Sequence, residues 1–196
     1  LRGAMDIGLD IPPAVIDKAI ASVKGYYRAM GNADGKQYGA DPLGLRPGAF
    51  TYNGGKVTTA MAAAGAVCLQ EFGLYEDFRI PRSLDHIVND VRNLKPRKGH
   101  IPFDAYAMYY VAQGLYQVGG TRWRENYPVI RDAIVETQQV STSSTVDGSW
   151  DGGRVGGVPG KLFGTSVGVF VLSIPNRYLP ILQEGEFTAD NENSNK

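Results

Sequence analysis

Net charge, cysteine, histidine and long apolar runs are all scarce in this sequence of 196 residues. Lys and Arg together number 20, and so do Asp and Glu, which makes the formal net charge zero at pH 7. A nucleic-acid-binding protein has a basic excess, so the balance argues against that class. No apolar run approaches the roughly 20 residues that a membrane-spanning helix needs. The sequence therefore predicts a globular domain without a membrane span and without a nucleic-acid partner.

The few cysteines and histidines limit the metal and redox chemistry that the chain can perform. The sequence has one cysteine, Cys68, and two histidines. A single cysteine excludes a disulfide within the chain and a zinc site of several cysteines. The composition therefore predicts no cofactor, and it assigns no cellular compartment.

What the sequence does contain is an alternation of two kinds of helical segment. Residues 13–30, 81–94 and 126–139 each combine an apolar stripe at helical spacing with charged residues on the other side. Residues 56–72, 104–118 and 162–174 carry almost no charge. An amphipathic helix lies at the surface, whereas a helix that is apolar all round is buried on most sides. We therefore expect an all-α fold of three helical hairpins, each with an outer amphipathic helix and an inner apolar helix.

Short stretches that recur along the chain indicate an internal repeat. The stretch "LQEFGLYEDFRIP" (69–81) aligns loosely with "LYQVGGTRWRENYP" (115–128). The stretch "GAMDIGLDIPP" (3–13) has the same shape, with Gly8 in the place of Gly73. We therefore expect the first residues to be the end of an inner helix of a preceding repeat. The tail at 184–196 is polar, which predicts disorder.

A glycine-rich turn with an aromatic residue lies between the outer and the inner helix of two repeats. It is "NADGKQYG" (32–39) in one repeat and "TVDGSWDG" (145–152) in another. A helix that ends in Gln, followed by Asp-Gly-Ser-Trp and an apolar helix, resembles the QW repeat of squalene cyclases. The same pattern resembles the wider prenyltransferase/squalene-oxidase repeat family, including its uncharacterised planctomycete-type members.

The resemblance implies that residues 1–183 form part of an α/α toroid, in which inner helices surround a central cavity and outer helices encircle them. The chain departs from the family pattern in two places. "VSTSSTV" separates Gln138 and Gln139 from Asp147, and no Gln precedes Asp34 in the first repeat. Three hairpins are about half of a full toroid, so the resemblance also implies a partner that completes the ring. This partner would be either preceding repeats of the same protein or a second copy of the chain.

The turn at 145–152 has two interpretations. Asp147 and Asp151 are candidates for a catalytic acid, and Asp104 with Asp151 is a candidate carboxylate pair for glycoside hydrolysis. Alternatively, the turn is a structural clasp between repeats. In that case Gly148 permits the turn, Asp147 caps it and Trp150 covers the end of the neighbouring helix with one N–H donor.

Two further sets of residues are candidates for ligand and metal binding. Aromatic residues in or beside the inner helices are candidates for lining a central cavity. Alternatively, they are core residues whose hydroxyls reach the rim of the domain. The candidates are Tyr106, Tyr109, Tyr110, Trp150 and Phe163. Cys68, His100 and Asp104 are possible zinc ligands, since His100 and Asp104 are four residues apart at a helix start. Against zinc, Cys68 lies on an alanine-rich stripe typical of a core.

These observations lead to two hypotheses of function. In the first, the chain is a repeat domain without a catalytic motif that binds an apolar ligand or a protein partner in its concave centre. In the second, the protein is an isoprenoid-processing enzyme, of the terpene cyclase or prenyltransferase type, whose catalytic acid lies in repeats upstream. The Asp-x-Asp-Asp motif of cyclases and the Asp-Asp-x-x-Asp motif that binds magnesium are both absent from this sequence.

Overall fold

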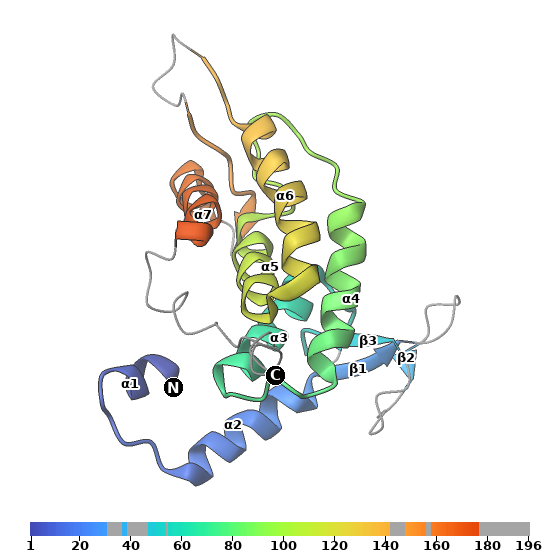
Figure 1. The fold of residues 1–196 in the computed structure, drawn as a ribbon, viewed down its shortest axis with the longest axis vertical. Coiled ribbons are helices and arrows are strands. Elements are labelled where there is room, and N and C mark those ends of the chain that lie inside the picture. Colours follow the sequence, from blue (N-terminus) through green and yellow to red (C-terminus); the bar gives the residue numbers. More distant parts are fainter. Residues whose placement is uncertain (31–36, 39–46, 54, 142–147, 156–157, 177–196) are drawn as a thin grey trace, which may run out of the picture.

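The fold is predominantly helical, as the alternation of segments predicts. The computed structural model describes residues 1–30, 37–38, 47–53, 55–141, 148–155 and 158–176. Within these ranges there are seven α-helices and one short 3-10 helix, Ile174–Asn176 (Figure 1). The α-helices are α1 (Arg2–Asp6), α2 (Pro13–Gly25), α3 (Thr59–Glu71), α4 (Arg79–Arg92), α5 (Ala105–Val118), α6 (Gly120–Thr137) and α7 (Lys161–Ser173). The predicted tail at 184–196 lies outside the described residues.

Two small antiparallel sheets correct the expectation of a purely helical fold. The first has the strand order β2-β1-β3, with β1 at Tyr27–Met30, β2 at Gln37–Tyr38 and β3 at Gly48–Phe50. The second pairs β4 (Arg154–Val155) with β5 (Val158–Pro159). The helix expected over 13–30 therefore ends at Gly25. Tyr27 and Ala29 alternate as buried residues, and Tyr27 is opposite Phe50 in the register of β1 with β3.

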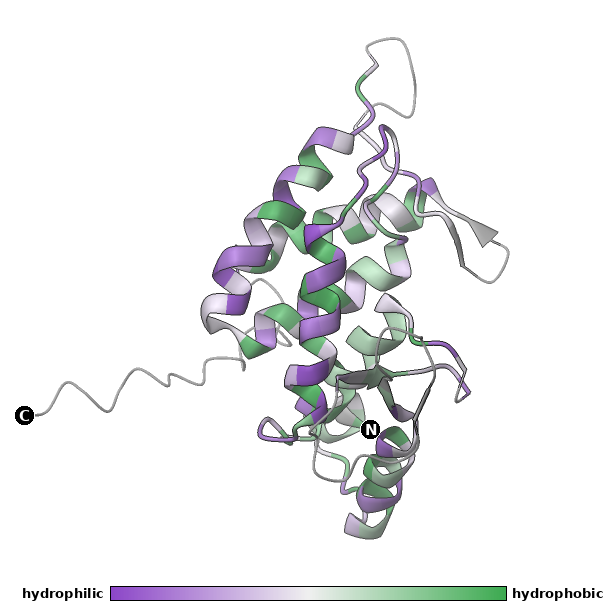
Figure 2. Ribbon diagram, turned by 90° about the vertical axis from the view of Figure 1, so that its right-hand side faces the viewer, coloured by the Kyte–Doolittle hydropathy of each residue, from purple (hydrophilic) through white to green (hydrophobic). Residues whose placement is uncertain are grey.

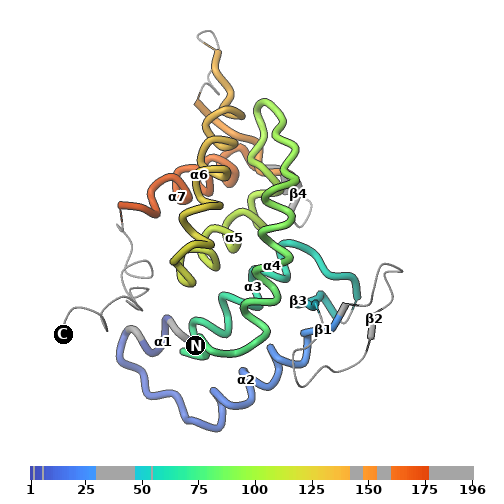
Figure 3. The backbone as a smooth tube through the Cα atoms, turned by 45° about the vertical axis from the view of Figure 1, so that its right-hand side comes forward, coloured from blue at the N-terminus to red at the C-terminus, as the bar shows by residue number. Residues whose placement is uncertain are grey.

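Five of the helices form two rows that lie against each other. Helix α5 lies between α3 and α7, and we call these three helices the inner row. Helices α4 and α6 contact each other and cover the inner row, and we call them the outer row (Figures 1 and 3). Among α3 to α7, the amphipathic segments therefore lie in the outer row and the sparsely charged segments lie in the inner row.

Hydrophobic periodicity explains why α4 and α6 form the outer row. Helix α4 buries one stripe at helical spacing, composed of Ile80, Ser83, Leu84, Ile87 and Val91. Helix α6 buries a similar stripe, composed of Asn126, Ile130, Ala133, Ile134 and Thr137. The remaining faces of both helices carry hydrophilic residues toward solvent (Figure 2). A stripe of this width is the pattern of a surface helix.

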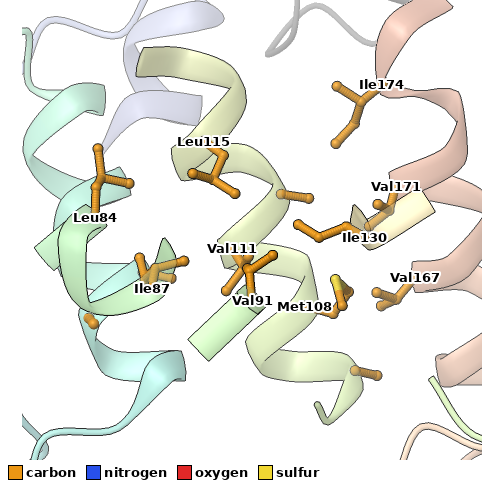
Figure 4. Close-up of a cluster of buried hydrophobic side chains, with 14 of the residues drawn as sticks. Leu84, Ile87, Val91, Met108, Val111, Leu115, Ile130, Val167, Val171 and Ile174 are labelled. Atoms are coloured by element: carbon orange, nitrogen blue, oxygen red, sulfur yellow. The ribbon is translucent and has the colours of Figure 1, made fainter. Parts of the chain in front are cut away.

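The core lies between the two rows. Leu84, Ile87 and Val91 of α4 point toward Val111 and Leu115 of α5, while Met108 faces Val167 and Val171 of α7 (Figure 4). Ile130 of α6 and Ile174 complete this cluster. In the described part of the chain, none of the helices has the length and apolarity needed to span a membrane.

The tight helix pairs differ from the expected hairpins. Each expected hairpin joined an outer helix to the inner helix that follows it. In the structure, the short connections instead lead from an inner helix to the next outer helix, at residues 72–78 between α3 and α4 and at Gly119 between α5 and α6. The connections from outer to inner helices are longer.

Helices α1 and α3 end in the same way. Gly73 has φ of +74°; its N–H donates to Gln70 O at 2.8 Å, and Leu74 N donates to Leu69 O at 2.9 Å. Gly8 has φ of +83°, and the equivalent bonds at the end of α1 are Gly8 N to Met5 O and Leu9 N to Ala4 O, both at 2.9 Å. This pair of bonds is the Schellman motif, which requires a left-handed residue and therefore favours glycine.

Candidate functional site

Three predicted ligand-binding residues lie together on one side of helix α5. Tyr106 and Leu115 are nine residues apart, or about two and a half turns, and so lie on opposite sides of the helix. Leu115 packs in the core beside α4. Tyr106 and its neighbour Tyr110 therefore face away from the outer row. This is the side on which the toroid hypothesis expects a central cavity.

The rings of these tyrosines form a continuous aromatic surface with helix α7. Tyr110 makes edge-to-face contacts with Tyr106 and with Tyr109, each with ring centroids 5.1 Å apart. Tyr109 also contacts Phe170 of α7, with centroids 5.0 Å apart. We call Tyr106, Tyr109, Tyr110 and Phe170 the aromatic face. All four side chains are partly exposed, so they remain accessible to a ligand.

The surroundings of the aromatic face are uncharged. Glu71 and Lys161 are the only charged residues of α3, α5 and α7, and each stands at a helix terminus. Burial raises the pKa of the Tyr110 hydroxyl, and the neighbouring Tyr106 raises it further. Burial also raises the pKa of the Cys68 thiol, with Glu71 adding to the effect. The tyrosine and the cysteine therefore stay neutral at physiological pH.

Two glutamines extend the stripe of Tyr106 and Tyr110 along α5. Gln113 and Gln117 follow at the same helical spacing, so the four residues share one side of the helix. Gln113 Nε2 donates to Tyr109 O at 3.1 Å, and Gln117 Nε2 donates to Glu71 Oε1 at 2.5 Å. The sequence analysis did not select these glutamines, although the spacing i, i+4, i+7, i+11 would have identified them.

The other two predicted ligand-binding residues occupy different positions. Phe163 is seven residues before Phe170 and so lies on the same side of α7, near the start of that helix, with 41% of its surface exposed. Trp150 is 3% exposed and lies in the core. Its Nε1 donates to Ile134 O at 2.8 Å, and its ring packs on Gly168 of α7. Trp150 is therefore not part of the aromatic face.

Trp150 belongs to a network that connects α6 to α7. Gln138 Nε2 donates to Gly148 O at 2.9 Å, so the glutamine and the glycine of the motif meet although they are ten positions apart in the sequence. Gly148 has φ of +78°. Trp150 N donates to Thr165 Oγ1 of α7 at 3.2 Å. The contacts of Trp150 and Gly148 are those that a structural clasp makes. We call Gln138, Gly148, Trp150 and Thr165 the clasp.

The candidate acids are held by local backbone hydrogen bonds. Asp104 is the N-cap of α5 and accepts from Ala107 N at 2.8 Å. Asp151 Oδ1 accepts from Gly153 N at 2.9 Å within a turn. Asp147, which precedes this turn, lies outside the described residues. Asp104 and Asp151 both lie near the N-terminal end of α5, since Ile101 N donates to Asp151 O at 2.9 Å. A cap and a turn explain both carboxylates without a catalytic role.

The residues suggested as zinc ligands are not brought together. Cys68 lies on α3 beside Tyr110, while the ring of His100 contacts the Arg97 guanidinium in the loop before α5. Asp104 is engaged in its helix cap. Across the part of the chain that the structure describes, there is no group of three or more His, Cys, Asp or Glu residues that could hold a metal ion.

Comparisons with known proteins give no family for this chain. Neither the family models, nor the curated proteins, nor the solved structures contain a match.

Proposed function

We propose that the chain is a binding domain that holds an uncharged, largely apolar small molecule on the aromatic face. The observation that supports this proposal is the unbroken series of ring contacts from Tyr106 through Tyr110 and Tyr109 to Phe170. Aromatic surfaces of this kind bury a large apolar area for few rotatable bonds. Ligand sites in proteins are mostly apolar and contain a small number of polar groups that fix orientation. The tyrosine hydroxyls would supply such groups here.

The charge of the surroundings restricts the ligand to neutral molecules. A carboxylate or phosphate would need a cationic partner, and the inner row offers Lys161 alone, whose Nζ donates to Gln139 Oε1 at 3.0 Å. Burying an unpaired charge is costly. An isoprenoid alcohol or a fused-ring hydrocarbon satisfies these conditions, whereas a prenyl diphosphate does not. The enzyme hypothesis gains no support from the described residues, because Asp104 and Asp151 act as a cap and a turn residue.

We further propose that the two rows are a section of an α/α toroid. Three features support this: the alternation of inner and outer helices, the position of the aromatic face on the side away from the outer row, and the shared Schellman ends at Gly8 and Gly73. Preceding repeats or a second copy of the chain would then complete the ring.

A binding assay with two neutral ligands tests the proposed function. We expect farnesol and squalene to give saturable chemical-shift changes in the amides of α5 and α7 when titrated into the full chain. Tyr110→Ser removes the ring that joins two of the contacts, and we expect it to weaken binding about tenfold, because an aromatic pair contributes about 1 kcal/mol beyond its area. Tyr52→Ser is the matched control, since Tyr52 lies after β3 and is 70% exposed.

Three outcomes of this assay would reject the proposal. They are no saturable change with either ligand, equal binding by the Tyr110→Ser and Tyr52→Ser variants, or tighter binding of farnesyl diphosphate than of farnesol. The Tyr110→Phe variant guards against a folding artefact, because it keeps the ring and removes the hydroxyl alone. Conversion of squalene or of a prenyl diphosphate to a product would instead establish the enzyme hypothesis.

A further inference from the structure

A second, polar groove lies on the opposite surface of the molecule, between the two helices of the outer row. Its volume is about 260 Å³, and α4 and α6 form its walls. The residues that line it are Asp85, Val88, Asn89, Arg92, Thr121, Arg122, Glu125 and Asn126. A volume just below the ~300–1,000 Å³ of typical ligand pockets limits the occupant to a small molecule.

An ion pair connects the two walls of the groove. Arg122 Nη2 donates to Asp85 Oδ1 at 2.6 Å, which links α6 to α4. The two helices run side by side in the same direction from this pair (Figures 1 and 3). Asn89 and Arg92 follow Asp85 by one and two turns along α4, and Glu125 follows Arg122 by one turn along α6. Asn89, Arg92, Glu125 and Asn126 therefore lie beyond the ion pair, whereas Thr121 precedes it.

The groups beyond the ion pair have unused hydrogen-bonding capacity. Asn126 is 3% exposed, and its Nδ2 donates to Arg122 O at 2.8 Å. No described residue donates to Asn126 Oδ1, and none pairs with the Glu125 carboxylate or the Arg92 guanidinium. Asn126 Oδ1 is not one of the fully enclosed polar atoms that lack a partner in the described part of the chain, so it stays accessible as an acceptor.

We propose that this groove binds a small zwitterion of the α-amino acid class. Its ammonium group would donate to Glu125 and to Asn126 Oδ1, and its carboxylate would accept from Arg92. Val88 offers the one apolar surface of the groove, which a short aliphatic side chain would cover. A neutral molecule would use neither the Glu125 carboxylate nor the Arg92 guanidinium, which are both exposed, and an ion of either sign would use only one of them. Charge-assisted bonds to both ends distinguish the zwitterion from these alternatives.

The test uses L-leucine with two analogues that each lack one charge. L-Leucinamide has no carboxylate, and N-acetyl-L-leucine has no ammonium group. We expect L-leucine to shift the amide resonances of Asn89 and Asn126 saturably in the full chain at constant pH and ionic strength. Each analogue should bind at least tenfold more weakly. Glu125→Gln and Arg92→Gln should each also weaken L-leucine binding about tenfold.

Glu136→Gln is the matched control variant, because Glu136 is an exposed carboxylate on α6 outside the groove. It should bind L-leucine as the unmodified chain does. The proposal is overturned if L-leucine causes no saturable shift, if an analogue binds as tightly as L-leucine, or if the Glu125→Gln variant binds as tightly as the Glu136→Gln variant. Because the groove is on the far side from Tyr110, the result does not depend on binding at the aromatic face.

Discussion

Gly164 shows how the lack of a side chain fixes one helix against its neighbour. A Cβ atom at this position would lie 2.6 Å from Trp150 O and 2.8 Å from the Asp151 carbonyl carbon, both backbone atoms that cannot rotate away. We therefore expect Gly164→Ala to lower the free energy of unfolding by about 1–3 kcal/mol, the usual cost of overpacking. Urea denaturation at neutral pH measures this change.

The control is Gly25→Ala, at the end of α2. A Cβ atom there has no neighbour within 4 Å, and the residue is helical. Replacing a helical glycine by alanine gains up to about 1 kcal/mol. The two substitutions should therefore have opposite signs. A Gly164→Ala variant as stable as the Gly25→Ala variant would contradict the close approach of α7 to residues 150–152.

Asp77 makes stability depend on pH at the junction of α2 with α3 and α4. Burial alone would raise the pKa of Asp77, but hydrogen bonds from Lys24 and Arg79 outweigh it and hold the pKa below the usual value of 3.8. A carboxyl with a lowered pKa stabilises the fold above its unfolded pKa, and this stabilisation is lost as the pH falls through the folded value. The Asp77 side chain is 8% exposed, and its Oδ2 is 2.9 Å from Lys24 Nζ.

We expect Asp77→Asn to lower the free energy of unfolding by about 1 kcal/mol at pH 7, the magnitude of a charge-assisted hydrogen bond near the surface. The difference from the unmodified chain should shrink as the pH falls below 3.8 and through the lower pKa of the folded state. Denaturant titrations at pH 7 and pH 2.5 measure the difference in the free energy of unfolding at each pH. Asp132→Asn, which removes an exposed pair with the adjacent Arg131, should have little effect at either pH. A constant difference across this range would show that Asp77 acts through packing alone.

At the scale of elements, the helices of the two rows could be predicted from the sequence and the strands could not. The stripe of Leu84, Ile87 and Val91 predicts α4, because burial of one side at helical spacing is the signal that sequence analysis detects best. The segment 26–30 continues the helical periodicity of α2, and the intrinsic propensities of its residues do not distinguish a helix from a strand. Its strand depends on pairing with Phe50, more than 20 residues later, and a local pattern carries no information on such a partner.

The candidate site was predicted in part for the same reason. Tyr106, Tyr109 and Tyr110 belong to one helix, so their common side followed from spacing alone. Trp150 was assigned to the ligand site and instead lies in the core, because its environment is set by Gly164 and Gly168 of a different helix. The polar groove between α4 and α6 had no sequence signal, since it exists only where the two helices meet.

The clasp gives an element-scale prediction about α7. Trp150 is the only residue of the clasp that contacts both α6, through Ile134 O, and the side of α7 at Gly168. Trp150→Phe removes the N–H donor and part of the ring, and we expect it to lower the protection of α7 amides from hydrogen exchange about tenfold. The amides of α3 and α4 should keep their protection, since they pack apart from the clasp. Equal loss of protection in α4 and α7 would show instead that the whole domain opens as one unit.

At the scale of the whole molecule, the inner row has an open end at α7. This helix has no charge after Lys161, which predicts burial on most sides, yet only Gly164, Val167, Gly168 and Val171 are buried. Leu162 is 83% exposed and Val169 is 54% exposed, and the two lie on one side of the helix because they are seven residues apart. A cluster of exposed apolar residues of this kind is typical of an interaction surface. Three hairpins without a partner are expected to leave an open end, and a partner at this surface would bury the remaining sides of α7.

The open end leads to a prediction about assembly. Exposed apolar residues also occur at the opposite end of the row, with Ile7 at 76% and Leu9 at 57% beside α1. We expect the chain to associate with itself at micromolar to millimolar concentrations, because this end and the α7 end are both apolar. Contact between two different surfaces of the same chain gives open-ended or ring-shaped assemblies. Sedimentation equilibrium should show an average mass that rises with concentration.

The Leu162→Lys, Val169→Lys double variant should remain monomeric while unfolding at the same denaturant concentration as the unmodified chain, because both side chains project into solvent. A monomer at every concentration in the unmodified chain would exclude a second copy as the occupant of the α7 surface.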